Sequence, residues 1–135
     1  MLAGRYTLLD HEMALQRLMP AAQRKKVDIV IGGPYSSGVL AGGRHFEYGA
    51  VPPAIAAKVE RISALCAKYQ IPIKAAALHF SLAHPASAAV IPGASKPARI
   101  LEDHVELATR IPDDFWLDLR RAGLVTPGAP LPIDN

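Results

Sequence analysis

The sequence has little of what marks a secreted or membrane-bound protein. It contains a single cysteine, Cys66, which rules out an internal disulfide framework. No apolar run approaches the ~18 residues of a membrane span, and the N-terminus lacks the layout of a signal peptide. We therefore expect a cytoplasmic chain that does not enter a membrane.

Charge and aromatic residues are also sparse. Charged residues make up 20% of the chain, the net charge is +3, and aromatic residues make up 6%. The isoelectric point near 9.2 suggests anionic ligands. However, the cations are scattered, whereas a nucleic-acid interface needs a clustered basic stripe with base-stacking aromatics. We therefore expect no nucleic-acid partner.

Metal and thiol chemistry have no support in the residue spacing. Cys66 falls on the apolar stripe of an expected helix, which predicts a buried and unreactive thiol. The histidines show no spacing typical of metal ligands, so we expect no metal site and interpret them as structural or solvated: His11, His45, His79, His84 and His104.

The apolar residues that are present, half of the chain, suffice for a core and follow an α/β pattern. Residues 27–31 predict a parallel strand buried on both faces. Other strands are expected at 1–9, ending in Arg5, Tyr6 and Thr7, and at 88–91. Helices are expected at 10–25, with Asp10 as N-cap and a kink near Met19 caused by Pro20, at 53–69, at 73–83 and at 96–106. A last helix begins near 111–116, with Asp113 as N-cap, and stops at Gly123.

Residues 89–100 have the outline of a phosphate-binding turn. An apolar run breaks at Pro92-Gly93, and Ser95 is a candidate N-cap for the helix that follows. Lys96 and Arg99 are spaced i and i+3 in that first turn, where the helix dipole also favours an anion. The spacing equally fits an ordinary strand-to-helix corner with two solvated cations, because it matches neither the P-loop nor the dinucleotide glycine pattern.

These segments resemble a known family. Residues 91–103 are similar to the last strand and following helix of the aldo-keto reductases, where the adenosine end of NAD(P) is held. Residues 3–9 resemble the sixth strand of that family, and residues 31–42, with five glycines between 32 and 43, its seventh strand and following loop. The order and the residues of these motifs most resemble the branch that contains L-fucose (D-threo-aldose) and pyridoxal dehydrogenases.

The resemblance implies an NADP or NAD site. Arg99 and Lys96 would meet the 2′-phosphate of NADP, and Glu102 and Asp103 the adenine amino group, although an i,i+3 ion pair between Arg99 and Glu102 is the alternative. The family positions that hold and stack the nicotinamide are Ala3 and Gly32 here. The full set of implied cofactor-binding residues is Tyr35, Ser36, Ser37, Val39, Gly93, Ala94, Ser95, Lys96, Arg99, Glu102 and Asp103.

The length limits what the chain is expected to do. A complete (β/α)8 barrel takes roughly 250 residues, whereas this chain has 135 and begins at the expected sixth strand. We therefore expect the C-terminal part of a TIM barrel, strands six to eight at residues 1–125 with a poorly ordered tail at 126–135, and no catalytic residues. The implied parent activity is oxidation of an aldose-like substrate by hydride transfer to NAD(P).

Two alternatives remain open at this stage. The first is a non-catalytic half-barrel, because three barrel strands leave edges that self-association or a complementing N-terminal half would cover. The second is the C-terminal piece of another phosphate-binding barrel, since anion sites after the seventh and eighth strands recur among unrelated enzymes. The acidic pair beyond Arg99 disfavours that second alternative, because it would recognise adenosine as well as phosphate.

Overall fold

The computed structural model describes residues 1–47 and 49–133; Tyr48, Asp134 and Asn135, which belong to the expected loop and tail, lie outside the described residues. The elements in chain order are β1 (Leu2–Ala3), the π-helical turn η1 (Ala14–Leu18), α1 (Met19–Lys25), β2 (Ile29–Gly32), the 3-10 turn η2 (Val39–Ala41), β3 (His45–Phe46), β4 (Gly49–Ala50), α2 (Pro53–Lys68), α3 (Ile73–Ala83), β5 (Ser87–Ile91), α4 (Pro97–Ala108) and α5 (Asp113–Arg121).

The main sheet is parallel and open. Its order is β1-β2-β5, with Leu2 paired with Ile31 and Gly32 paired with Ile91. β1 and β5 are therefore the edges of the sheet in the described part of the chain. The three parallel strands confirm the α/β prediction. Residues 44–51, expected to be irregular, contain the short antiparallel pair β3 and β4.

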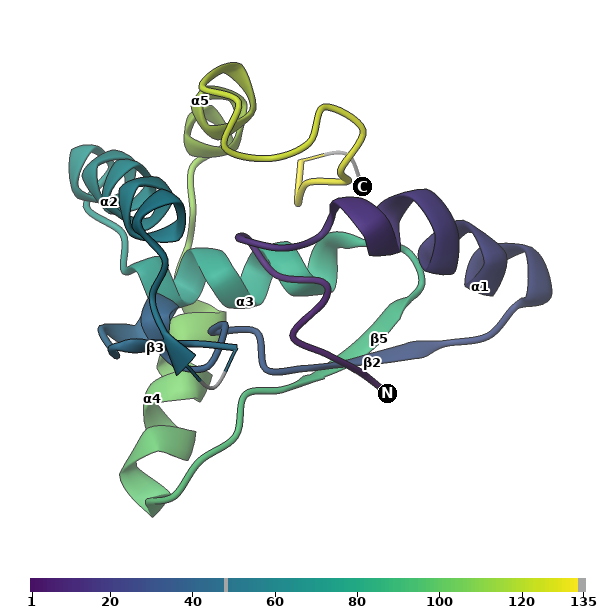
Figure 1. Cartoon of the computed structure of the whole chain (residues 1–135), viewed down its shortest axis with the longest axis horizontal. Coiled ribbons are helices and arrows are strands. Elements are labelled where there is room, and N and C mark those ends of the chain that lie inside the picture. Colours follow the sequence, from purple (N-terminus) through teal and green to yellow (C-terminus); the bar gives the residue numbers. More distant parts are fainter. Residues whose placement is uncertain (48, 134–135) are drawn as a thin grey trace.

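Helix α3 lies at the centre of the molecule. It packs on β5 on one side and on α2 on the other, and α2 in turn packs on α5 (Figure 1). The apolar composition of α3 explains this position, because Ala76, Leu78 and Phe80 are fully buried. Both α2 and α3 have the bounds expected from periodicity to within a residue.

The expected tail belongs to the core. Ala129 and Leu131 are fully buried, and Arg120 donates from Nη2 to the carbonyl of Ala129. The prediction of a poorly ordered segment is therefore wrong for residues 126–133. It rested on the proline content, whereas the apolar side chains of Ala129 and Leu131 pack into the core. Trp116 is a core residue as expected.

The strands are more exposed than predicted, and β1 and β2 are also shorter. β1 ends at Ala3 because Gly4 turns the chain at a φ of 66°, and Tyr6 and Leu8 then enter the core next to α3. β2 begins at Ile29, and Val27 is half exposed. The residues of β5 are also largely exposed, since the described residues place no strand beside its outer edge.

The first helix changes type where the proline lies. Met19 donates its N–H to the carbonyl of Ala14, a π-type bond, directly before Pro20, which has no N–H to donate. In place of the expected kink near Met19, the helix thus widens into a π-helical turn before Pro20. Asp10 is not the N-cap; its carboxylate binds Arg5 instead.

Candidate functional site

A cavity of about 430 Å³ lies where the carboxyl ends of the three parallel strands meet. Ligands of parallel α/β folds bind at this edge of the sheet. The lining residues come from the segments after β1, β2 and β5, from the β3–β4 region and from α4: Ala3, Gly4, Gly33, Tyr35, Ser36, Ser37, Gly38, Ala41, Glu47, Ile91, Pro92, Gly93 and Arg99. The cavity therefore brings together the glycine-rich loop, the Pro-Gly turn and one cation of the sequence prediction.

The loop after β2 is tightly folded. Ser36 and Ser37 have φ values of 52° and 60°, a region that non-glycine residues rarely adopt. Backbone bonds hold this conformation, including those from Gly38 N–H to the Tyr35 carbonyl and from Gly43 N–H to the Gly38 carbonyl. A Cβ at Gly43 would lie 2.7 Å from the Gly38 oxygen. The glycines thus allow the loop to close on itself.

Two of the predicted hydroxyl donors are engaged within the chain. The Ser36 hydroxyl is buried and donates to Thr7 Oγ1 at 2.9 Å. The Tyr35 hydroxyl donates to Asp103 Oδ1 at 2.5 Å, and burial, followed by this carboxylate, raises the pKa of Tyr35. Ser37 lines the cavity, whereas Val39 is buried and does not.

Helix α4 begins one residue later than predicted. Pro97 is its first residue and Lys96 its N-cap, without a side-chain capping bond, so the prediction that Ser95 is the N-cap is wrong. Lys96 has φ −137° and ψ 141°, the extended conformation favoured before proline. Of the two cations, only Arg99 lines the cavity; Ala94, Ser95 and Lys96 are outside its lining.

The acidic residues of α4 contact α3. Glu102 is exposed and lies 3.2 Å from Lys74 Nζ, while Asp103 is buried and lies 3.4 Å from the same nitrogen. Glu102 thus pairs with Lys74 rather than with Arg99, the partner that its i,i+3 spacing suggested.

Sequence reasoning missed Glu47. It lines the cavity from the loop between β3 and β4, and its carboxylate pairs with Arg5, which also binds Asp10 at 2.9 Å. No signal in the sequence pointed to this contact, because the two residues look like solvated surface charges 42 positions apart.

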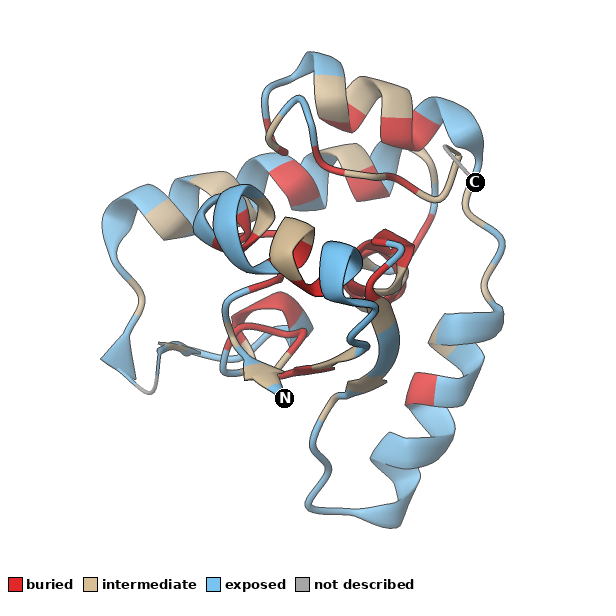
Figure 2. Cartoon of the chain, turned by 90° about the vertical axis from the view of Figure 1, so that its right-hand side faces the viewer, coloured by how far each residue is buried: buried red, intermediate tan, exposed pale blue. Residues whose placement is uncertain are grey.

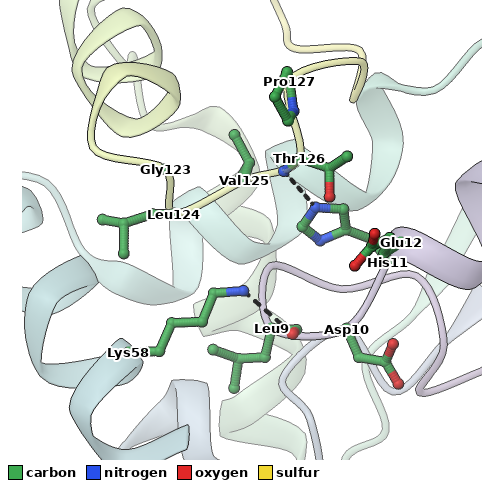
Figure 3. Close-up of a pocket in the computed structure, with 10 residues that line it drawn as sticks. All are labelled: Leu9, Asp10, His11, Glu12, Lys58, Gly123, Leu124, Val125, Thr126 and Pro127. Carbon is green, nitrogen blue, oxygen red and sulfur yellow. Dashed lines mark hydrogen bonds between the residues drawn. The ribbon is translucent and has the colours of Figure 1, made fainter. Parts of the chain in front are cut away.

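A second cavity, of about 420 Å³, lies between the loop after β1, α2 and the segment after α5 (Figure 3). Its central polar groups have partners within the chain. His11 Nδ1 lies 2.9 Å from the Thr7 carbonyl and Nε2 accepts from Thr126 N–H, while Lys58 donates to the Leu9 carbonyl. These bonds connect segments of the fold rather than present free groups to a ligand.

The described residues provide neither a membrane-spanning helix nor a cluster of metal ligands. Within the ranges 1–47 and 49–133, none of the helices combines the length and apolar composition needed to cross a bilayer. The same part of the chain contains no group of three or more histidine, cysteine and carboxylate side chains that could hold a metal ion.

Comparison with known proteins decides the family. The model of the aldo/keto reductase family matches residues 1–122. The chain belongs to the aldo/keto reductase family. It is 37% identical over 130 residues to pyridoxal 4-dehydrogenase from Microbacterium luteolum and 33% identical over 130 residues to D-threo-aldose 1-dehydrogenase from a Pseudomonas species.

The two alignments cover most of this chain but only a minor part of each relative. They include 93% of this chain but 38% and 39% of the two dehydrogenases. The chain thus spans less than half the length of the curated relatives that it matches. Its open sheet of three parallel strands is the C-terminal part of the family's (β/α)8 barrel, as the resemblance predicted, without a closed barrel among the described residues.

Proposed function

We propose that this chain supplies the adenosine and phosphate part of an NAD(P) site in an oxidoreductase that oxidises an aldose or a related hydroxy compound. The observation that supports the proposal is the cavity at the strand ends, which combines the glycine-rich loop, Gly93 and Arg99. The relatives named as dehydrogenases support the reaction class.

The residues present fit the phosphate end of the cofactor better than its reactive end. The Arg99 guanidinium is suited to a phosphate, and Gly33, Gly38 and Gly93 allow close approach of backbone to ligand. When bound, NAD(P) accepts a hydride from the substrate carbon. At the strand ends where the nicotinamide would lie, Ala3 and Gly32 offer neither an amide nor an aromatic ring.

We infer that the chain alone does not turn over substrate. Proton transfer at the reacting carbon needs a positioned acid or base within hydrogen-bond reach. Among the described residues, the ionisable side chains that line the cavity are Tyr35, Glu47 and Arg99, and we assign none of them to that step. The expected result is no NADPH formation when the purified chain is incubated with L-fucose and NADP; measurable turnover would refute this part of the proposal.

A thermal-shift titration tests the cofactor site. We expect the melting temperature to rise with 2′-phospho-ADP-ribose and less with ADP-ribose, because Arg99 favours the additional phosphate. A ligand at a hundred times its Kd adds about 2.7 kcal/mol to the free energy of unfolding. Arg99→Gln should remove the difference between the two ligands.

Arg24→Gln is the matched control, since Arg24 is exposed on α1 and does not line the cavity. It should retain the response of the unmodified chain to both ligands. Equal responses of the unmodified chain to both ligands would contradict the role of Arg99, and no response to either would contradict the site.

We also propose that the chain associates with another chain through the exposed face of α4. Ile100, Leu101 and Val105 are 53–68% exposed, and among the described residues no strand pairs with the outer edge of the adjoining strand β5. Apolar surface of this kind is typical of an interface, and an open strand edge is a template for pairing. We propose that a second copy of the chain or a complementing N-terminal half covers this face.

Light scattering tests association. For self-association, the chain should have a mass above the 14.4 kDa of one copy, and Leu101→Lys combined with Val105→Lys should lower it to that value. Met13→Lys changes an exposed apolar residue on another helix and should leave the mass unchanged. A single-copy mass for the unmodified chain would leave the complementing half as the partner to be tested by co-expression.

A further inference from the structure

Helix α4 is anchored to the rest of the molecule in an unusual way. Among its described residues Asp103 is buried, whereas Ile100, Leu101, Val105 and Leu107 are exposed (Figure 2). A surface helix normally docks through its apolar stripe. In α4 the buried side chain is instead a carboxylate.

The buried carboxylate has two partners on two other segments. Tyr35, in the loop after β2, donates its hydroxyl to Asp103 at 2.5 Å. Lys74, on α3, lies 3.4 Å from the same oxygen, and its Nζ lies 5.2 Å from the centre of the Tyr35 ring. A buried charge is costly unless it is paired and hydrogen-bonded, and here it is both. The three side chains therefore connect the loop, α3 and α4.

The contacts of Asp103 also affect the cavity, because Arg99 lies on the same helix. Residues four apart lie on the same side of a helix, so Asp103 is one turn beyond Arg99 on one side of α4. Tyr35 and Arg99 both line the cavity. A shift of α4 relative to the loop would therefore change the distance between the guanidinium and any ligand held by the glycines.

We propose that Tyr35, Lys74 and Asp103 form a positioning cluster that sets the place of Arg99 at the cavity and thereby the preference for a ligand with a 2′-phosphate. This inference rests on the proposed function. Asp103 is then a positioning residue and not an adenine ligand, and Glu102, which is exposed, is the member of the acidic pair left for that role.

A second group of side chains in the same protein serves as a control for the Tyr35 cluster. At the contact of α2 with α5, Tyr69 donates to Asp118 at 2.5 Å, and Lys68 lies 2.9 Å from the same carboxylate oxygen and 5.1 Å from the Tyr69 ring centre. This second trio has the same chemistry but holds a helix that also buries Phe115, Trp116 and Leu119. Removing either tyrosine hydroxyl is thus the same chemical change at two places.

The test is the affinity of the chain for adenosine 2′,5′-bisphosphate and for AMP, measured by calorimetry. Tyr35→Phe should weaken binding of the bisphosphate about tenfold, as expected for loss of a hydrogen bond to a charged group, and that of AMP less than twofold. Asp103→Asn keeps an acceptor for the tyrosine hydroxyl and should retain most of the preference for the bisphosphate. Tyr69→Phe should leave both affinities within twofold. An unchanged ratio of the two affinities in Tyr35→Phe would overturn the proposal.

Hydrogen exchange separates this inference from the proposed function. Tyr35→Phe should speed exchange of the α4 amides at least tenfold relative to the unmodified chain, and Tyr69→Phe should not. If the unmodified chain binds neither nucleotide, the proposed function fails, and the exchange rates still decide whether the cluster holds α4. Unchanged α4 exchange in Tyr35→Phe would refute the cluster whatever the nucleotides do.

Discussion

His11 shows how a single side chain joins distant parts of the chain. It is 3% exposed, and its ring lies between the carbonyl of Thr7 and the N–H of Thr126, which are far apart in sequence. Since Nε2 accepts a hydrogen bond, Nδ1 carries the proton of the neutral ring and donates to Thr7. A proton on Nε2 would face the Thr126 N–H, so the fold favours neutral His11.

Stability should therefore fall in mild acid. Burial lowers the pKa of His11 from 6.5, with Lys58 opposing protonation and Asp10 and Glu12 favouring it. Below pH 6.5 the unfolded chain binds more protons than the folded chain, so the free energy of unfolding decreases as pH falls from 6.5 toward the lowered pKa. His84, whose pKa burial also lowers, adds to this trend.

Urea unfolding of His11→Gln at pH 7.5 and 5.5 isolates the contribution of His11. The variant should be less stable than the unmodified chain at pH 7.5 by about 1–3 kcal/mol because a buried N–H loses its acceptor. It should lose less stability than the unmodified chain between the two pH values, because it lacks His11, whereas His84 contributes equally in both proteins. Equal losses in the two chains would contradict the assignment to His11.

Cys66 should be nearly inert in the folded chain. It lies on the buried stripe of α2, and burial raises the pKa of its thiol from 9.0 to about 11. The reactive thiolate is thus about a hundredfold scarcer at pH 8 than for an ordinary cysteine, before access is considered. Labelling by a thiol reagent should be slow in buffer and fast in urea; rapid labelling in buffer would show that α2 opens easily.

At the level of elements, periodicity located the helices better than the strands. The recurrence of Ile62 and Cys66 placed α2, and the nearly unbroken apolar run from Ala75 to Phe80 placed α3 in the core. The strand expected at 1–9 is shorter than predicted because Tyr6 and Leu8 are buried in a bent segment rather than in a strand. Helix α4 was expected one residue too early because Ser95 is a preferred N-cap residue, whereas the extended residue before Pro97 is Lys96.

Leu131 tests the corrected view of the C-terminal segment. Because its side chain is fully buried, Leu131→Ala should lower the free energy of unfolding by about 2–4 kcal/mol, through lost burial and a cavity. Urea unfolding measures this change, and Pro130→Ala is a control at the neighbouring half-buried position. A loss below about 0.5 kcal/mol for Leu131→Ala would mean that the segment does not pack in solution.

At the scale of the molecule, the sequence predicted the parallel sheet and the part of the family's barrel to which it belongs. It did not predict the side-chain hydrogen bonds at the cavity. Tyr35 and Ser36 were expected to face a ligand, and their hydroxyls instead donate to Asp103 and Thr7. Such pairings depend on side chains 68 and 29 positions apart, which no local pattern encodes. Of the predicted cofactor-binding residues, the structure brings those of the glycine-rich loop, Gly93 and Arg99 to one cavity, and their role there stays a prediction.

An amide NMR titration of the chain with adenosine 2′,5′-bisphosphate tests the central claim most directly, because it reports where the ligand binds. We predict chemical-shift changes at Gly33, Gly38, Gly93 and Arg99, which line the cavity at the strand ends, and none at His11 or Thr126 in the second cavity. Shifts confined to the second cavity, or no shifts at saturating ligand, would contradict the assignment of the adenosine site.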